Sequence, residues 1–121
     1  MRNPLRVILF LLAACLLSLV SARAQTQGEM NREAAAEFQK ADRELNKLYP
    51  QVVAKLDAEG QEKLKAAQRA WVAFRDAQAA LEADSARGGT MAPLLHSASL
   101  TATTQDRIKQ LRAFLKELSE R

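Results

Sequence analysis

Residues 64–81 read LKAAQRAWVAFRDAQAAL, and this stretch decides the fold. One set of positions recurs at steps of three and four: Leu64, Ala67, Trp71, Phe74, Gln78 and Leu81. That spacing places them on one face of an α-helix, whereas a strand would alternate every second residue. Alanine, the strongest helix former, fills many of the positions between them. The stretch therefore predicts a long helix over residues 59–84.

The same spacing occurs upstream, between residues 29 and 56. Its apolar positions are Met30, Ala34, Phe38, Ala41, Leu45, Leu48, Val52 and Leu56. Pro50 interrupts this helix because it lacks a backbone donor, and it predicts either a kink or the start of a new helix. Residues 57–60, which read DAEG, predict a turn before the next helix.

Downstream, two glycines and a proline make residues 85–93 the most loop-like stretch. Thr103, with Asp106 three residues later, has the pattern of a helix start. Ile108 and Leu111 then begin another helical repeat, which predicts a helix over residues 104–119. We therefore expect an all-α fold, a small antiparallel helical bundle of two long helices and a shorter C-terminal helix.

The first 24 residues have the pattern of a secretory signal peptide. Arg2 and Arg6 precede an apolar run of 14 residues, and Ala22-Arg23-Ala24 has the small-x-small pattern of a cleavage site. A run of that length rises about 21 Å as a helix, less than the roughly 30 Å needed to span a membrane. We expect cleavage after Ala24, a domain over residues 25–121 and a periplasmic or secreted protein.

A second interpretation of this segment is lipidation. Residues 12–15, which read LAAC, resemble the lipobox of bacterial lipoproteins, and Cys15 would then carry a lipid and bring the protein to a membrane. Four apolar residues follow within the next five positions, where a polar tether is usual, so cleavage after Ala24 is the preferred interpretation.

Composition excludes several classes of site. The chain has one His and one Cys, too few for a zinc finger or a disulfide framework within the chain, and we expect no metal, cofactor or enzymatic activity. Of the 18 basic residues, three lie in the signal segment, so the mature domain has 15 basic and 14 acidic residues, a net charge of +1. That balance gives no basic stripe for nucleic acid. Cleavage also removes Cys15, so the mature domain has no cysteine.

Polar residues lie beside the apolar faces of both long helices. Asp42 and Asn46 are four residues apart, and Gln68, Trp71 and Arg75 follow at steps of three and four. Four of these residues can line a ligand pocket: Asp42, Asn46, Gln68 and Arg75. Alternatively, these four with Trp71 and Asp76 form a polar network that fixes the register of the two helices. The network is the preferred interpretation, because polar groups near a core must be paired.

Five segments together resemble a known family. They are TQ-x-EMN from Thr26, AD-x-x-LN-x-x-Y from Ala41, AQ-x-x-W-x-x-x-RD from Ala67, GGT from Gly88 and T-x-x-R-x-x-x-L from Thr104. In this order they resemble the lysozyme inhibitor LprI-like N-terminal domain, a small secreted bacterial helical domain. The resemblance implies a helical domain in the cell envelope that binds lysozyme. Members of that family usually carry cysteines where this chain has Glu33, Ala79 and Ser99, so bridges that would hold residues 84–104 are absent.

Two functions follow from the resemblance. The chain is either an inhibitor of lysozyme or an envelope module that binds another protein or a ligand without inhibiting. For an inhibitor, we expect the irregular segment from Ser85 to His96 to enter the sugar-binding cleft, with Arg87, Thr90 and His96 as the binding residues. A domain of net charge +1 gains no long-range attraction to a basic lysozyme.

Overall fold

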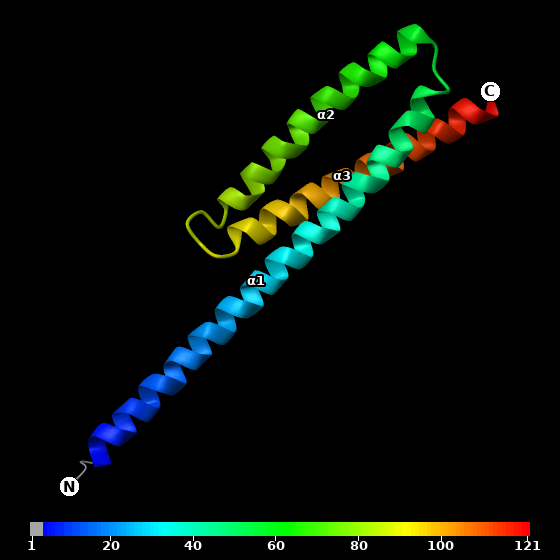
Figure 1. Ribbon diagram of the computed structural model, residues 1–121. Helices are drawn as coiled ribbons and strands as arrows, with labels where there is room; N and C mark the ends of the chain where they lie inside the picture. Colours follow the sequence, from blue (N-terminus) through cyan, green and yellow to red (C-terminus); the bar gives the residue numbers. More distant parts are fainter. Residues whose placement is uncertain (1–3) are drawn as a thin grey trace.

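The computed structural model contains three α-helices: α1 (Pro4–Val53), α2 (Ala58–Asp84) and α3 (Ala92–Glu120) (Figure 1). It describes the backbone of residues 4–121 and the side chains from Thr26 onward. Residues 1–3, the start of the predicted signal peptide, lie outside the described residues. Helices and turns account for residues 4–121, with no strand among them, so the predicted all-α class is confirmed.

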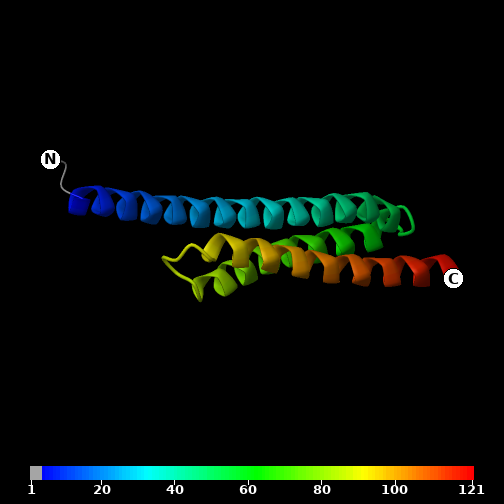
Figure 2. The ribbon, with the colours of Figure 1, turned by 90° about the horizontal axis from the view of Figure 1, so that it is seen from below.

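The helices run up, down and up, so that α1 and α3 are parallel and α2 is antiparallel to both (Figures 1 and 2). α3 packs against both of the other helices, whereas α1 and α2 approach one another closely at few backbone positions. The expectation of two long helices and a short third is wrong. From Gln25 to Val53 α1 has 29 residues, and α2 and α3 have 27 and 29 residues, so the three packed helices are similar in length.

The predicted start of the last helix is also wrong, because α3 begins at Ala92 and not at residue 104. Pro93 lies in the first turn, where its missing N–H costs no helical hydrogen bond. Thr104, the first residue of the predicted helix, has no exposed surface and lies between buried Leu100 and Ile108. The buried face of α3 thus includes a hydroxyl residue, and a single helix extends from residue 92 to residue 120.

Pro50 does not break the first helix, which continues to Val53. The expected turn at residues 57–60 is the first turn of α2, because Asp57 Oδ1 accepts a hydrogen bond from the Gly60 backbone N–H at 2.8 Å. Gln61 Nε2 donates to the carbonyls of Val53 and Leu56, both at 3.1 Å. These bonds satisfy carbonyls at the end of α1 and fix the connection to α2.

The buried core lies mainly between α1 and α3. We call this contact the apolar seam, formed by Ala41, Leu45, Leu48 and Val52 of α1 with Ile108 and Leu111 of α3. Leu64 is the one residue that α2 contributes to the buried cluster. Ala79 of α2 and Ser99 of α3 are also buried, while Glu33 is exposed. Two of the three positions at which the resembling family carries cysteines thus lie inside the α2–α3 pair.

α1 extends well beyond the other helices at its N-terminal end (Figures 1 and 2). Arg112 Nη2 of α3 donates a hydrogen bond to Glu44 Oε1 of α1, 68 residues earlier in the chain. Because α1 and α3 are parallel, the same offset places Ala92, the first residue of α3, about level with Ala24. The part of α1 beyond the bundle therefore corresponds to the predicted signal peptide. In the part of the chain that the structure describes, no helix is both long and apolar enough to cross a membrane.

Candidate functional site

Arg75 of α2 lies at the centre of a cluster of polar and aromatic side chains between α1 and α2. Only 12% of its side chain is exposed. Its Nη1 lies 3.5 Å from Asp42 Oδ1 on α1, and its Nη2 lies 2.9 Å from Asp76 Oδ1 on α2. The guanidinium carbon lies 5.3 Å from the ring centre of Phe38 and 5.2 Å from that of Trp71. At these distances a cation is attracted to an aromatic face, so Arg75 joins α1 to α2.

Trp71 also joins α2 to α3. The guanidinium carbon of Arg107, on α3, lies 5.9 Å from the Trp71 ring centre. Arg107 Nε donates to Gln68 Oε1 at 3.0 Å, and its Nη1 donates to Gln110 Oε1 at 3.2 Å. Burial lowers the pKa of Arg107, although a guanidinium remains charged at any physiological pH. One indole ring therefore lies close to cations from two helices.

The structure brings the six residues of the predicted network into this cluster. Asn46 Nδ2 donates to Asp42 Oδ2 at 3.2 Å, which orients the carboxylate that faces Arg75. Gln68 differs from the prediction, because it binds α3 and not α1. Asp76 binds its own neighbour, Arg75.

Sequence reasoning missed two members of the cluster, Phe38 and Arg107. Phe38 is four residues before Asp42, so its place on the same helix face was available as a signal. In the sequence, Arg107 is distinguished only by its place in the T-x-x-R motif that begins at Thr104. Its contact with Trp71 depends on how α2 and α3 pack, which spacing along the chain does not give.

A groove of about 450 Å³ lies beside this cluster, with walls from α1 and α2. Its lining combines apolar, amide and charged side chains: Asp42, Leu45, Asn46, Tyr49, Lys65, Gln68, Arg69, Trp71, Val72 and Arg75. The polar network and the ligand pocket, the two interpretations of these residues, thus correspond to neighbouring parts of one region. Arg75 and its partners form the contact between helices, and the space next to them is a groove.

The predicted binding residues lie at the opposite end of the bundle from the α1–α2 connection. Residues 85–91 form the α2–α3 loop, and Gly88 has a φ of 75°, a conformation that favours glycine. Arg87 is exposed and makes two hydrogen bonds to Asp84, at 2.7 and 2.6 Å, which raise the Arg87 pKa. Thr90 is exposed in the loop.

His96 was expected in an irregular segment, and that expectation is wrong, because residue 96 lies on α3. It is exposed there. The loop is consequently shorter than expected and is held by backbone hydrogen bonds, such as Gly89 N–H to Ala86 O at 2.9 Å. Among residues 26–121, no group of three His, Cys, Asp or Glu side chains is placed to hold a metal ion.

Comparison with known proteins gives two matches. A family model described as "Lysozyme inhibitor LprI" matches residues 20–111. An uncharacterized protein of Rhizobium meliloti (strain 1021) is 37% identical over 106 aligned residues, which cover 77% of this chain and 76% of the relative. No solved structure was found to match the chain.

Proposed function

The chain belongs to the lysozyme inhibitor LprI family, and from that premise we propose that it is a helical binding protein of the cell envelope that inhibits lysozyme. The observation that carries this proposal is the extent of the family match. Residues 20–111 include the packed part of α1, all of α2, the α2–α3 loop and most of α3. The family description is that of an inhibitor, and we propose binding without catalysis.

Export and cleavage after Ala24 are part of the proposal. Two independent observations support them. The family match begins at residue 20, close to the proposed cleavage site. The offset between Glu44 and Arg112 places that site level with the start of α3, so a chain beginning at Gln25 keeps the whole bundle. Mass spectrometry of the protein from the cell envelope should find Gln25 at the N-terminus, whereas a lipid on Cys15 would contradict cleavage there.

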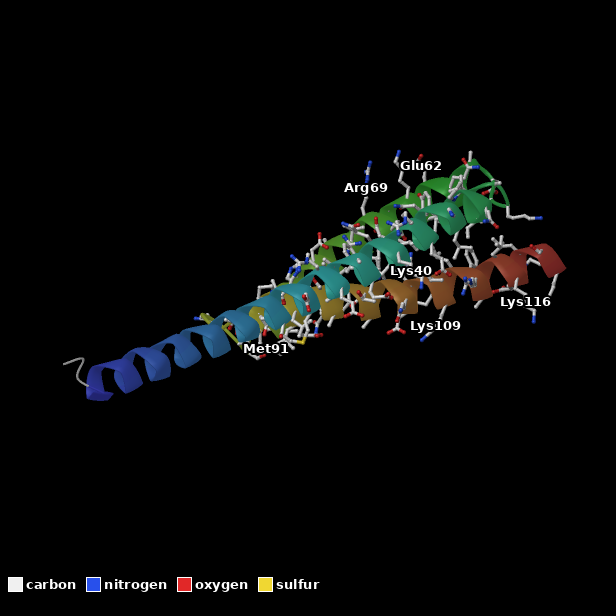
Figure 3. The ribbon with its side chains drawn as sticks, turned by 60° about the horizontal axis from the view of Figure 1, so that its bottom comes forward. Lys40, Glu62, Arg69, Met91, Lys109 and Lys116 are labelled. Atoms are coloured by element: carbon white, nitrogen blue, oxygen red, sulfur yellow. The ribbon has the colours of Figure 1, made fainter. Side chains whose placement is uncertain are left out.

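The α2–α3 loop is the proposed inhibitory contact. It is the irregular end of a rigid helical scaffold, and such segments commonly carry binding residues. Arg87 and Thr90 are exposed in the loop, His96 is exposed near the start of α3, and Met91 adds an apolar side chain that is 43% exposed (Figure 3). Arg87 would exchange the Asp84 carboxylate for a catalytic carboxylate of the enzyme. Because an existing pair must be broken, we expect inhibition in the micromolar range.

A non-inhibitory envelope module is the second candidate, and the α1–α2 groove favours it. That groove offers a partner or ligand a site that does not involve the loop. Under this alternative, purified protein leaves lysozyme fully active at high micromolar concentration.

The test is lysis of bacterial cell walls by lysozyme in the presence of the purified protein. We expect inhibition, and we expect at least a tenfold loss of it when Arg87, Thr90 and His96 are replaced together by Ala. A matched control replaces Arg43, Gln39 and Gln105 by Ala, which also removes one positive charge from exposed positions. Inhibition that survives the first triple change would place the contact on the helices and reject the loop as the binding element.

A further inference from the structure

We propose that the groove between α1 and α2 binds a small organic anion, a molecule with a carboxylate, sulfonate or phosphate group on an apolar body. The groove volume of about 450 Å³ lies within the range of ligand sites, roughly 300–1,000 Å³. The proposal concerns a site on the side of the bundle, away from the α2–α3 loop. It can therefore succeed or fail independently of lysozyme inhibition.

The apolar side chains of the groove can contact the apolar body of the ligand. Leu45 of α1 is buried, and Tyr49, Trp71 and Val72, which also line the groove, are partly exposed. Burying apolar ligand surface against such side chains is the usual source of affinity in small-molecule sites, with few polar groups fixing the orientation. Asn46 and Gln68 supply those polar groups at the groove wall.

The charges of the lining favour an anion. α2 contributes three cations, Lys65, Arg69 and Arg75, whereas α1 contributes one carboxylate, Asp42. Arg75 pairs with Asp42 and with Asp76, which is not part of the groove lining, so these five charges sum to +1. Lys65 and Arg69 therefore supply the positive charge that remains unbalanced.

Lys65 and Arg69 are one helical turn apart, and neither has a carboxylate partner among residues 26–121. Two like charges at this spacing disfavour a helix, so the pair has no evident structural benefit. Lys63, on the same helix but outside this groove, pairs with Glu59 at 2.6 Å. The Arg69 side chain extends from α2 into solvent (Figure 3), where it is free to close over a bound anionic group. A carboxylate, sulfonate or phosphate would receive charge-assisted hydrogen bonds from both cations.

The experiment uses 8-anilinonaphthalene-1-sulfonate, an apolar ring system with one sulfonate. Trp71 is the single tryptophan of the chain and lines the groove, so energy transfer from its indole reports a bound probe nearby. N-phenyl-1-naphthylamine has the same ring system without the sulfonate and serves as the neutral probe. We expect saturable binding of the anionic probe and at least tenfold weaker binding of the neutral one.

Substitution separates this groove from other apolar sites. In the double variant Lys65→Gln/Arg69→Gln, affinity for the anionic probe should fall at least tenfold while binding of the neutral probe stays unchanged. The control is Arg43→Gln/Lys47→Gln, another pair of exposed cations one turn apart, which does not line the groove. It should leave both affinities within twofold, and circular dichroism should show equal helix content in all three proteins. The proposal is overturned if the anionic probe does not bind, if the neutral probe binds as tightly, or if the Lys65/Arg69 variant keeps its affinity.

Discussion

α1 and α3 meet through the apolar seam, whereas the contacts of α2 with α1 are largely polar and cation–π. The seam contains six buried apolar residues, and α2 adds only Leu64 to that cluster. Grooves flank α2 on both sides, about 450 Å³ against α1 and about 380 and 450 Å³ against α3. The difference indicates that the seam supplies most of the stability and that α2 forms the adaptable surface.

Exposed apolar side chains on α2 point to the same contrast. Phe74 is 56% exposed and Leu81 is 66% exposed, although both belong to the helical repeat that predicted a buried face. A helix with few buried contacts opens at lower free energy than the rest of a domain. We therefore expect α2 to be the first helix to separate.

The largest expected effect comes from shortening a leucine in the seam. Leu45→Ala should lower the free energy of unfolding by about 2–5 kcal/mol, because Leu45 is only 2% exposed and its removal leaves a cavity in the core. The same change on α2, Leu81→Ala, should cost less than about 0.5 kcal/mol. Urea denaturation of both variants measures this. Equal losses would mean that α2 is packed as firmly as the seam.

An intermediate effect is expected from the cation between α1 and α2. Arg75→Ala should lower the free energy of unfolding by about 1–3 kcal/mol, because partly buried Asp42 loses its partner and two rings lose a cation. Arg43→Ala, which removes an exposed guanidinium outside the groove, is the control. An unchanged melting temperature of the Arg75 variant, together with loss of binding to the anionic probe, would assign Arg75 to ligand binding.

The smallest expected effect is a gain in stability within α3. Thr104 Oγ1 is buried without a hydrogen-bond partner in the described structure. Thr104→Val keeps the shape and should raise the free energy of unfolding by about 1 kcal/mol. Thr101→Val is the matched control, since the Thr101 hydroxyl donates to the Ser97 carbonyl at 2.9 Å, and that change should give no gain. Thermal melts in which Thr104→Val is less stable than the parent would show that the hydroxyl has a partner.

Helix faces could be predicted from the sequence, because they follow from the spacing of apolar residues. Contacts between helices could not, because they depend on how the helices pack. The repeat from Ala41 to Val52 correctly identified the α1 face of the seam, and Asp42 and Asn46, four residues apart, share a face of α1 and a hydrogen bond. The predicted start of α3 was too late, because Thr104 has a polar side chain that is nevertheless buried in the helix. The Trp71–Arg107 contact was missed because it depends on the register between α2 and α3, which no local pattern encodes.

Amide hydrogen exchange, measured on the protein alone and with lysozyme, tests the central claim that a rigid seam supports a binding element at the end of α2. We predict slowest exchange in residues 41–52 and 104–111 in both states, faster exchange in α2, and slowing by lysozyme confined to residues 84–96. Slow exchange throughout α2 would contradict the claim that α2 is held less firmly than the seam between α1 and α3. Slowing elsewhere than residues 84–96, or no change with lysozyme present, would contradict the proposed contact.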